Sequence, residues 1–124
     1  MVQRIRLPLE HGTPASVARR VAERALRGWG LTERADDVLL ITTELVQNVT
    51  KHTDDGGELV LSLHGDAILI EVADTSPQPP RLQPPADRRL GGRGLMLVAA
   101  VASDWGCRGD GDGKVVWAEV PQHP

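Results

Sequence analysis

The sequence is poor in aromatic residues and in cysteine. Tyrosine and phenylalanine are absent, and the 124 residues contain three tryptophans, Trp29, Trp105 and Trp117. The core must therefore be built from aliphatic side chains and alanine. A single cysteine, Cys107, excludes an internal disulfide and a cysteine-based zinc site, so we expect it to be a small buried hydrophobic residue.

Blocks of basic charge and long apolar segments are also missing. The chain carries 14 lysines and arginines against 17 acidic residues, with no basic cluster, which argues against a nucleic-acid groove. Its longest apolar run, residues 95–102, is far shorter than the roughly 20 residues that cross a bilayer. Neither a signal-peptide pattern nor a histidine spacing typical of a metal site is present. We therefore expect a soluble cytoplasmic protein that contacts neither nucleic acid nor a membrane directly.

Residues 36–53 have the periodicity of an amphipathic helix. At about 100° per residue, one side carries the aliphatic residues Val38, Ile41, Leu45, Val46 and Val49. Glu44 and Asn48 lie one turn apart on the other side. A carboxylate and a carboxamide at this spacing are often no more than a solvated face, so a functional interpretation depends on the motifs farther along the chain.

The remaining patterns predict an α+β fold in a single domain, residues 1–124. Residues 2–9 alternate as a strand, and Pro8 favours an edge position. Thr13 is expected to cap a helix with Pro14 as its first residue, and Gly28 or Gly30 to end it. The buried stripe expected for this helix is Val17, Val21, Ala25 and Trp29. Thr32 is expected to cap the helix at 36–53.

Two hairpins and a third helix complete the expected elements. The first hairpin joins strands 58–64 and 67–73 through Gly65-Asp66, and the second joins 104–108 and 115–120 across 109–113. Residues 95–103 are apolar all round, so that helix is expected to be largely buried. This order predicts a two-layer α/β sandwich with helices covering one face of the sheet.

Between the hairpins lies a proline-rich segment at about 75–93. It holds five of the nine prolines, which neither a helix nor a central strand tolerates. A loop of this length is typical of a lid, a binding loop or a disordered insert. It ends in Gly91-Gly92-Arg93-Gly94 at a helix start, where close backbone amides and the helix dipole favour a phosphate, although many such segments are simple turns.

Three polar side chains are candidates for chemistry. Asp74 ends a buried strand, where a carboxylate is costly without a partner; it either caps a turn beside Ser76 or accepts a ligand's amino group such as adenine N6. Asn48 suits a Mg²⁺ ion that keeps water and phosphate ligands. Glu44 suits the role of proton acceptor for an attacking hydroxyl.

These motifs resemble those of the GHKL ATPases. Glu44-x-x-x-Asn48 with Lys51-His52 is similar to the N box of that superfamily. Val72-Ala73-Asp74 is similar to its G1 box, and the segment from Gly91 to Leu95 to its G2 box. The resemblance covers residues 36–120. Its short length makes the chain most similar to the stand-alone RsbW/SpoIIAB-type anti-sigma-factor serine kinases.

The resemblance implies a Bergerat (HATPase_c-type) fold with a mixed, mostly antiparallel sheet that binds ATP and Mg²⁺. It implies that Glu44 is the general base, Asn48 holds Mg²⁺ and Asp74 reads adenine. The remaining nucleotide-binding residues that it implies are Lys51, His52, Gly92, Arg93, Gly94 and Leu95. The segment 75–93 would be the ATP lid, in which Arg88 or Arg89 reaches the γ-phosphate.

The implied partners are a sigma factor and a STAS-type anti-anti-sigma protein that is phosphorylated on serine, with a homodimer through the 2–9 edge. Two departures from the family pattern concern the expected adenine site. Asp74 is followed by no glycine up to Gln78, and Val115 stands where many relatives carry a threonine near adenine. The primary hypothesis is an ATP-dependent serine kinase and anti-sigma regulator. The alternatives are a non-catalytic nucleotide- or partner-binding module that acts by sequestration, and a plain α+β domain.

Overall fold

The computed structural model describes residues 3–10, 13–52, 56–74, 93–111 and 113–122, with the backbone alone described for 50–52, 93–95 and 110. The elements in chain order are β1 (Arg4–Leu9), α1 (Ala15–Trp29), the 3-10 helix η1 (Thr32–Arg34), α2 (Ala35–His52), β2 (Gly57–His64), β3 (Ala67–Asp74), α3 (Arg93–Val101), β4 (Asp104–Asp110) and β5 (Gly113–Pro121). Both predicted hairpins and the predicted order of elements are confirmed.

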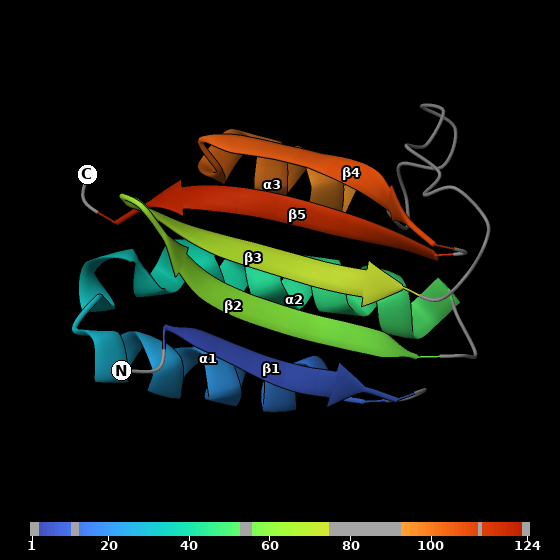
Figure 1. Ribbon diagram of the computed structural model, residues 1–124, viewed down its shortest axis with the longest axis horizontal. Coiled ribbons are helices and arrows are strands. Elements are labelled where there is room, and N and C mark those ends of the chain that lie inside the picture. The colour runs from blue at the N-terminus through green and yellow to red at the C-terminus, as the bar shows by residue number, and fades with distance from the viewer. Residues whose placement is uncertain (1–2, 11–12, 53–55, 75–92, 112, 123–124) are drawn as a thin grey trace.

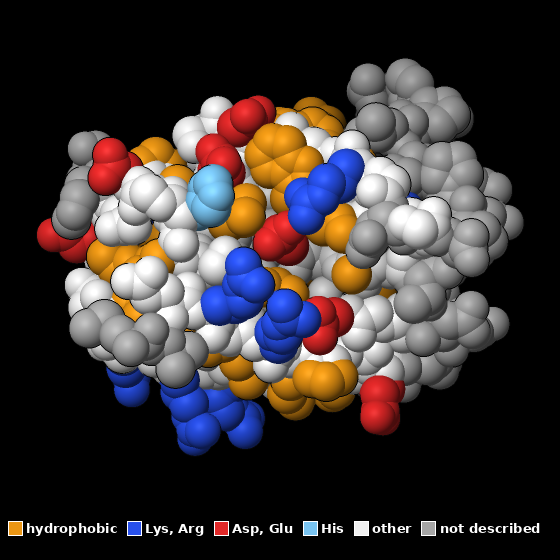
Figure 2. All heavy atoms as spheres, in the orientation of Figure 1, with side chains coloured by type: hydrophobic (Ala, Val, Ile, Leu, Met, Phe, Trp, Pro, Cys, Tyr) orange, Lys and Arg blue, Asp and Glu red, His pale blue; other side chains and the backbone are white. Residues whose placement is uncertain are grey.

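The described strands form one sheet in the order β1-β2-β3-β5-β4, and every pairing in it is antiparallel. The expected mixed sheet would contain at least one parallel pair of strands, and no such pair occurs among the described strands. Figure 1 shows α1, α2 and α3 together behind the sheet, which confirms the predicted two-layer sandwich. The other face carries no helix among the described residues, and basic and acidic side chains lie among apolar ones across it (Figure 2). β1 lies at a sheet edge, as Pro8 predicted.

The core lies between the sheet and the helices. Alternation along β2 and β3 turns Leu59, Leu61, Ile68, Ile70 and Val72 toward the helices, where each is at most 1% exposed. The aliphatic stripe predicted for α2 meets them, and its five members are at most 3% exposed. Burying one such side chain contributes about 1.5–3 kcal/mol, so this contact holds α2 across the middle of the sheet.

The start and the buried face of α1 differ from the prediction. Pro14 precedes the helix, and the Thr13 hydroxyl oxygen accepts the backbone N–H of Glu10 at 2.8 Å instead of capping α1. The fully buried residues of α1 are Ala18, Ala22 and Leu26, whereas Val17 is 37% exposed, so the predicted stripe is one residue out of phase. Small side chains at the contact let α1 pack closely on the rest of the domain.

The boundary between α1 and α2 is partly as predicted. Gly30 ends α1 with the left-handed φ of 72° that glycine adopts without strain. Thr32, however, begins the 3-10 helix and does not cap α2, because a short turn with its own hydrogen bonding is inserted between the two helices.

The prediction that the third helix is largely buried is wrong. Among the side chains described in α3, Val98 is fully buried, whereas Met96 and Leu97 are 61% and 43% exposed. α3 lies at the border of the helical layer with α2 as its neighbour, so one side of it remains open (Figure 1). None of the helices described is long and apolar enough to cross a membrane.

Candidate functional site

The predicted site elements gather at one end of the sandwich. α2 and β3 finish there, while α3 and β5 begin there, at the right of Figure 1. Contacts of α2 with α3, β3 and β5 hold these elements together. The antiparallel connections thus bring motifs that are far apart in the chain to one place, as a shared nucleotide site requires.

Glu44 and Asn48 lie on the flank of α2 that faces away from α1. Leu39 marks the opposite flank, because it lines a hollow together with Leu26 and Arg27 of α1. At about 100° per residue, Glu44 is about 140° and Asn48 about 180° around the helix from Leu39. Both side chains are half-buried, so they are partly shielded and still accessible to a ligand. The predicted i, i+4 pair is therefore present on the helix.

Asp74 is the last residue of β3, and its side chain is turned to the covered face, where it is 3% exposed. Its neighbours in the sheet register are Gly57 of β2 and Lys114 of β5. The ammonium Nζ of Lys114 lies 3.0 Å from Asp74 Oδ2, and the Lys114 side chain is 15% exposed. The buried carboxylate thus has the charged partner that its burial demands. Ser76, the alternative turn partner, lies outside the described residues.

Lys114, and not Val115, is the β5 residue beside Asp74. Val115 pairs with Ala73 and points to the opposite face of the sheet, because successive residues of a strand alternate. The prediction that Val115 occupies the adenine position is therefore wrong, and the sequence reasoning missed Lys114. One signal could have found it: Val116, Ala118 and Val120 are buried residues of β5, and the same alternation places Lys114 on their side.

Gly57 connects this row of the sheet to α2. A Cβ atom at Gly57 would lie 1.9 Å from the backbone oxygen of Ala73 and 3.3 Å from Val49 Cγ1. Val49 directly follows Asn48, so the last turns of α2 lie against the row formed by Gly57, Asp74 and Lys114. The position tolerates no side chain, and the close approach ties the Asn48 region to the Asp74 end of β3.

Residues 11–120 match the family model described as histidine kinase-like ATPase domain. The chain belongs to this family. The resemblance to GHKL ATPases seen in Glu44, Asn48 and Asp74 is thereby confirmed. Domains of this family bind ATP, usually with Mg²⁺.

The ATPase domain is also similar in fold to a solved structure, that of the RsbU and RsbW domains of Rv1364c from Mycobacterium tuberculosis. The TM-score is 0.73 at 17% sequence identity, and the match covers 97% of this chain. The chain spans about a third of that structure's chain, 32% of its length. A comparison with curated proteins gave no significant match.

The other motif residues of the ATPase domain are placed by backbone alone or not at all. Lys51 and His52 form the end of α2, and Arg93, Gly94 and Leu95 the start of α3, both at the end where Asp74 lies. Gly92, like the candidate lid with Arg88 and Arg89, lies outside the described residues. The N-box backbone and the described part of the G2-box backbone, residues 93–95, are thus at the same end of the sandwich.

The donor chemistry of the described residues fits nucleotide-bound Mg²⁺ better than a metal held by protein alone. No cluster of three or more histidine, cysteine, aspartate or glutamate side chains suited to a metal occurs in the described part of the chain. A single neutral amide such as that of Asn48 can still hold Mg²⁺, because the ion retains waters and takes its remaining ligands from phosphates.

Cys107 lies on β4 in register with Val116 and is half-buried against the core. Burial raises the pKa of its thiol, while the positive charges of Lys114 and Arg108 act in the opposite direction and lower it. Asp74 raises the same pKa and is the weakest of these four influences. The thiol is therefore a neighbour of the Asp74–Lys114 pair and responds to its charge.

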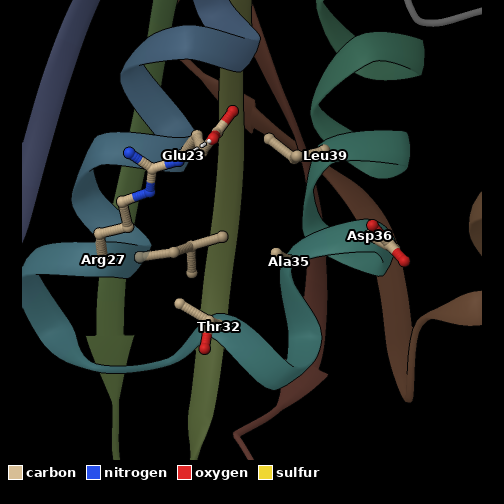
Figure 3. A pocket seen from close by; sticks show the side chains of 7 residues that line it. Glu23, Arg27, Thr32, Ala35, Asp36 and Leu39 are labelled. Atoms are coloured by element: carbon tan, nitrogen blue, oxygen red, sulfur yellow. Dashed lines mark hydrogen bonds and ion pairs between the residues drawn. The ribbon is translucent and has the colours of Figure 1, made fainter.

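A hollow of about 380 Å³ lies elsewhere, between α1 and the start of α2. Figure 3 shows Glu23 and Arg27 of α1 on one side of it and Asp36 and Leu39 on the other. Arg27 donates to Glu23 Oε1 at 2.7 Å, so an ion pair covers part of its rim. Because Leu39 marks the flank of α2 opposite to Asn48, this hollow is separate from the candidate nucleotide site.

Proposed function

We propose that this chain is an ATP-dependent serine/threonine protein kinase that acts as an anti-sigma factor. In this proposal it binds a sigma factor and phosphorylates a serine of a STAS-type anti-anti-sigma partner. The observation that carries the proposal is Asp74, a carboxylate that is 3% exposed at the very end of β3, beside the turn of α2 that follows Asn48. A charged group is retained at such a position only at a cost in stability, which favours a role in binding.

Each residue has a role that its chemistry suits. The bound nucleotide supplies the phosphoryl group and, with Asn48, the ligands of Mg²⁺. Asp74 accepts a hydrogen bond from adenine N6, and Glu44 accepts the proton of the attacking serine hydroxyl. We assign phosphate binding to the end of α2, with Lys51 and His52, and to the start of α3, with Arg93, Gly94 and Leu95. Gly92 receives the same role from its place in the sequence motif alone. A homodimer through the β1 edge stays a prediction.

The test is a calorimetric titration of ATP, with and without Mg²⁺, into the wild type and the Asp74→Asn variant. We expect micromolar binding that requires Mg²⁺ and that weakens by about 1–3 kcal/mol in Asp74→Asn, because a buried hydrogen bond to the base is weakened. Glu71→Gln is the matched control, since Glu71 lies on the same strand and is turned to the open face. A folded wild type that binds no ATP would remove the kinase proposal.

The second candidate is a non-catalytic module that binds nucleotide or a partner and regulates by sequestration. It is favoured by the ion pair between Asp74 and Lys114, which differs from the threonine arrangement expected of the family. ATP turnover that is lost in Glu44→Gln while ATP binding persists would favour the kinase. Binding without turnover in the wild type would favour the module.

A further inference from the structure

The carboxylate assigned to base recognition is shared with a lysine. Asp74 Oδ2 and Lys114 Nζ are 3.0 Å apart, on adjacent strands and in direct register. Both side chains are largely shielded, with 3% and 15% exposed. An ammonium group, strongly hydrated in water, is therefore held at the same buried strand end as the recognition carboxylate.

A purely structural role would be that Lys114 neutralises a buried charge. The pair, however, lies where β3 ends and β5 begins, at the end of the sandwich to which the predicted nucleotide motifs converge. A carboxylate accepts about four hydrogen bonds and an ammonium donates three, so each of the two groups can hold more than one partner at a time. The pair offers an acceptor and a donor side by side.

We propose that Lys114 is a base-selecting residue that reads the Watson–Crick edge of adenine together with Asp74. Lys114 donates a hydrogen bond to the ring nitrogen N1, and Asp74 accepts one from the N6 amino group. The inference rests on the proposed function, since it concerns the base of the bound ATP. A hydroxyl group at this position would donate to N1 without a positive charge, and an aliphatic side chain would donate nothing.

The selectivity follows from the order of donors and acceptors. Adenine presents a donor at position 6 and an acceptor at position 1, which match the carboxylate and the ammonium. Hypoxanthine and guanine present an acceptor at position 6 and a donor at position 1, so both contacts become repulsive in the same pose. A shielded site built from charged hydrogen-bonding groups rejects such a mismatch strongly, because its own groups are left unpaired.

The experiment compares the dissociation constants of ATP and 1-deaza-ATP, in which a C–H replaces N1, for the wild type and Lys114→Met. Inosine triphosphate is titrated as the reversed pattern, and Arg108→Met is the matched control. Arg108 forms its ion pair with Glu71 on the open face, so its charge is removed without touching the covered site. Circular dichroism confirms folding of each variant before titration.

We expect the wild type and Arg108→Met to bind 1-deaza-ATP at least tenfold more weakly than ATP, and inosine triphosphate more weakly still. In Lys114→Met the two adenine nucleotides should bind within twofold of each other, because the donor to N1 is gone. If 1-deaza-ATP binds more weakly than ATP by the same factor in Lys114→Met as in the wild type, the inference is overturned.

Equal affinities of the wild type for ATP and 1-deaza-ATP would also overturn the inference, and this comparison needs no variant if Lys114→Met fails to fold. In either case ATP still binds, and the proposed function stands. A folded wild type that binds neither nucleotide would instead remove the proposed function, and the inference with it.

Discussion

Two ion pairs start from the same strand and differ in the face of the sheet that they occupy. Glu71 of β3 pairs with Arg108 on the open face, and their side chains are 17% and 52% exposed. Asp74, three residues later, pairs with Lys114 on the covered face, where the corresponding values are 3% and 15%. An odd spacing along a strand turns side chains to opposite faces, so one short sequence contains both environments.

Burial changes how much the same kind of ion pair contributes to stability. On the open face, which Figure 2 displays, water and salt screen the charges, and such a pair contributes little to stability. On the covered face each charge has lost most of its water, so each depends on the other. The open pair is therefore replaceable, whereas the covered pair is a constraint that a binding role would explain.

The largest expected effect comes from breaking the covered pair. Lys114→Met leaves the Asp74 carboxylate buried without its cation, and we expect the free energy of unfolding to fall by about 3 kcal/mol. Arg108→Met, which breaks the open pair, should lower it by less than about 1 kcal/mol. Urea denaturation followed by circular dichroism measures both values.

A double variant serves as the control for this prediction. Asp74→Leu combined with Lys114→Met removes both charges and should recover most of the lost stability, because an apolar pair of similar size is tolerated in a covered site. Equal effects of Lys114→Met and Arg108→Met would contradict the distinction between the two faces.

The next effect concerns the packing beside the covered pair. Gly57→Ala should lower the free energy of unfolding by about 1–3 kcal/mol, because its Cβ would lie 1.9 Å from the Ala73 oxygen and must displace the backbone. Gly109→Ala is the matched control, since Gly109 pairs with Lys114 in the same register row and a Cβ atom there would have nothing within 4 Å. Urea denaturation should leave Gly109→Ala within about 0.5 kcal/mol of the wild type. A similar loss of stability in both variants would contradict the close packing of Ala73 and Val49 against Gly57.

The smallest expected effect is a change in the pKa of the Cys107 thiol when the charge of Lys114 is removed. Lys114 lowers the pKa of this thiol, so Lys114→Met should raise that pKa further and reduce the thiolate fraction at pH 8. Alkylation by iodoacetamide should then be slower by less than about tenfold. Arg108→Met should slow it less, since Arg108 is the weaker of the two influences. Faster alkylation in Lys114→Met would contradict the placement of the ammonium near the thiol. For every variant the rate should rise with pH as the thiolate forms.

The elements with strict periodicity could be predicted from the sequence. The predictions of the buried stripe of α2 and of the alternating faces of β2 and β3 are right at nearly every named aliphatic position. They succeed because the periodicities of a helix and of a strand differ and each is repeated several times in its segment. For α1 the apolar residues span adjacent positions, so Ala18 and Ala22 could not be distinguished from Val17 and Val21 without the neighbouring helix. For α3 the composition predicted burial, but its place at the border of the helical layer leaves Met96 exposed.

The sequence by itself determined which residue types are available for chemistry: a carboxylate and an amide one turn apart in α2, and a carboxylate at the end of an apolar strand. It also determined the family, because these residues lie in recognisable motifs. Only the tertiary structure decided that Lys114, 40 positions after Asp74, is its partner, because strand register depends on the packing of the whole sheet. A shift of one residue would have turned Val115, instead of Lys114, to the covered face beside Asp74.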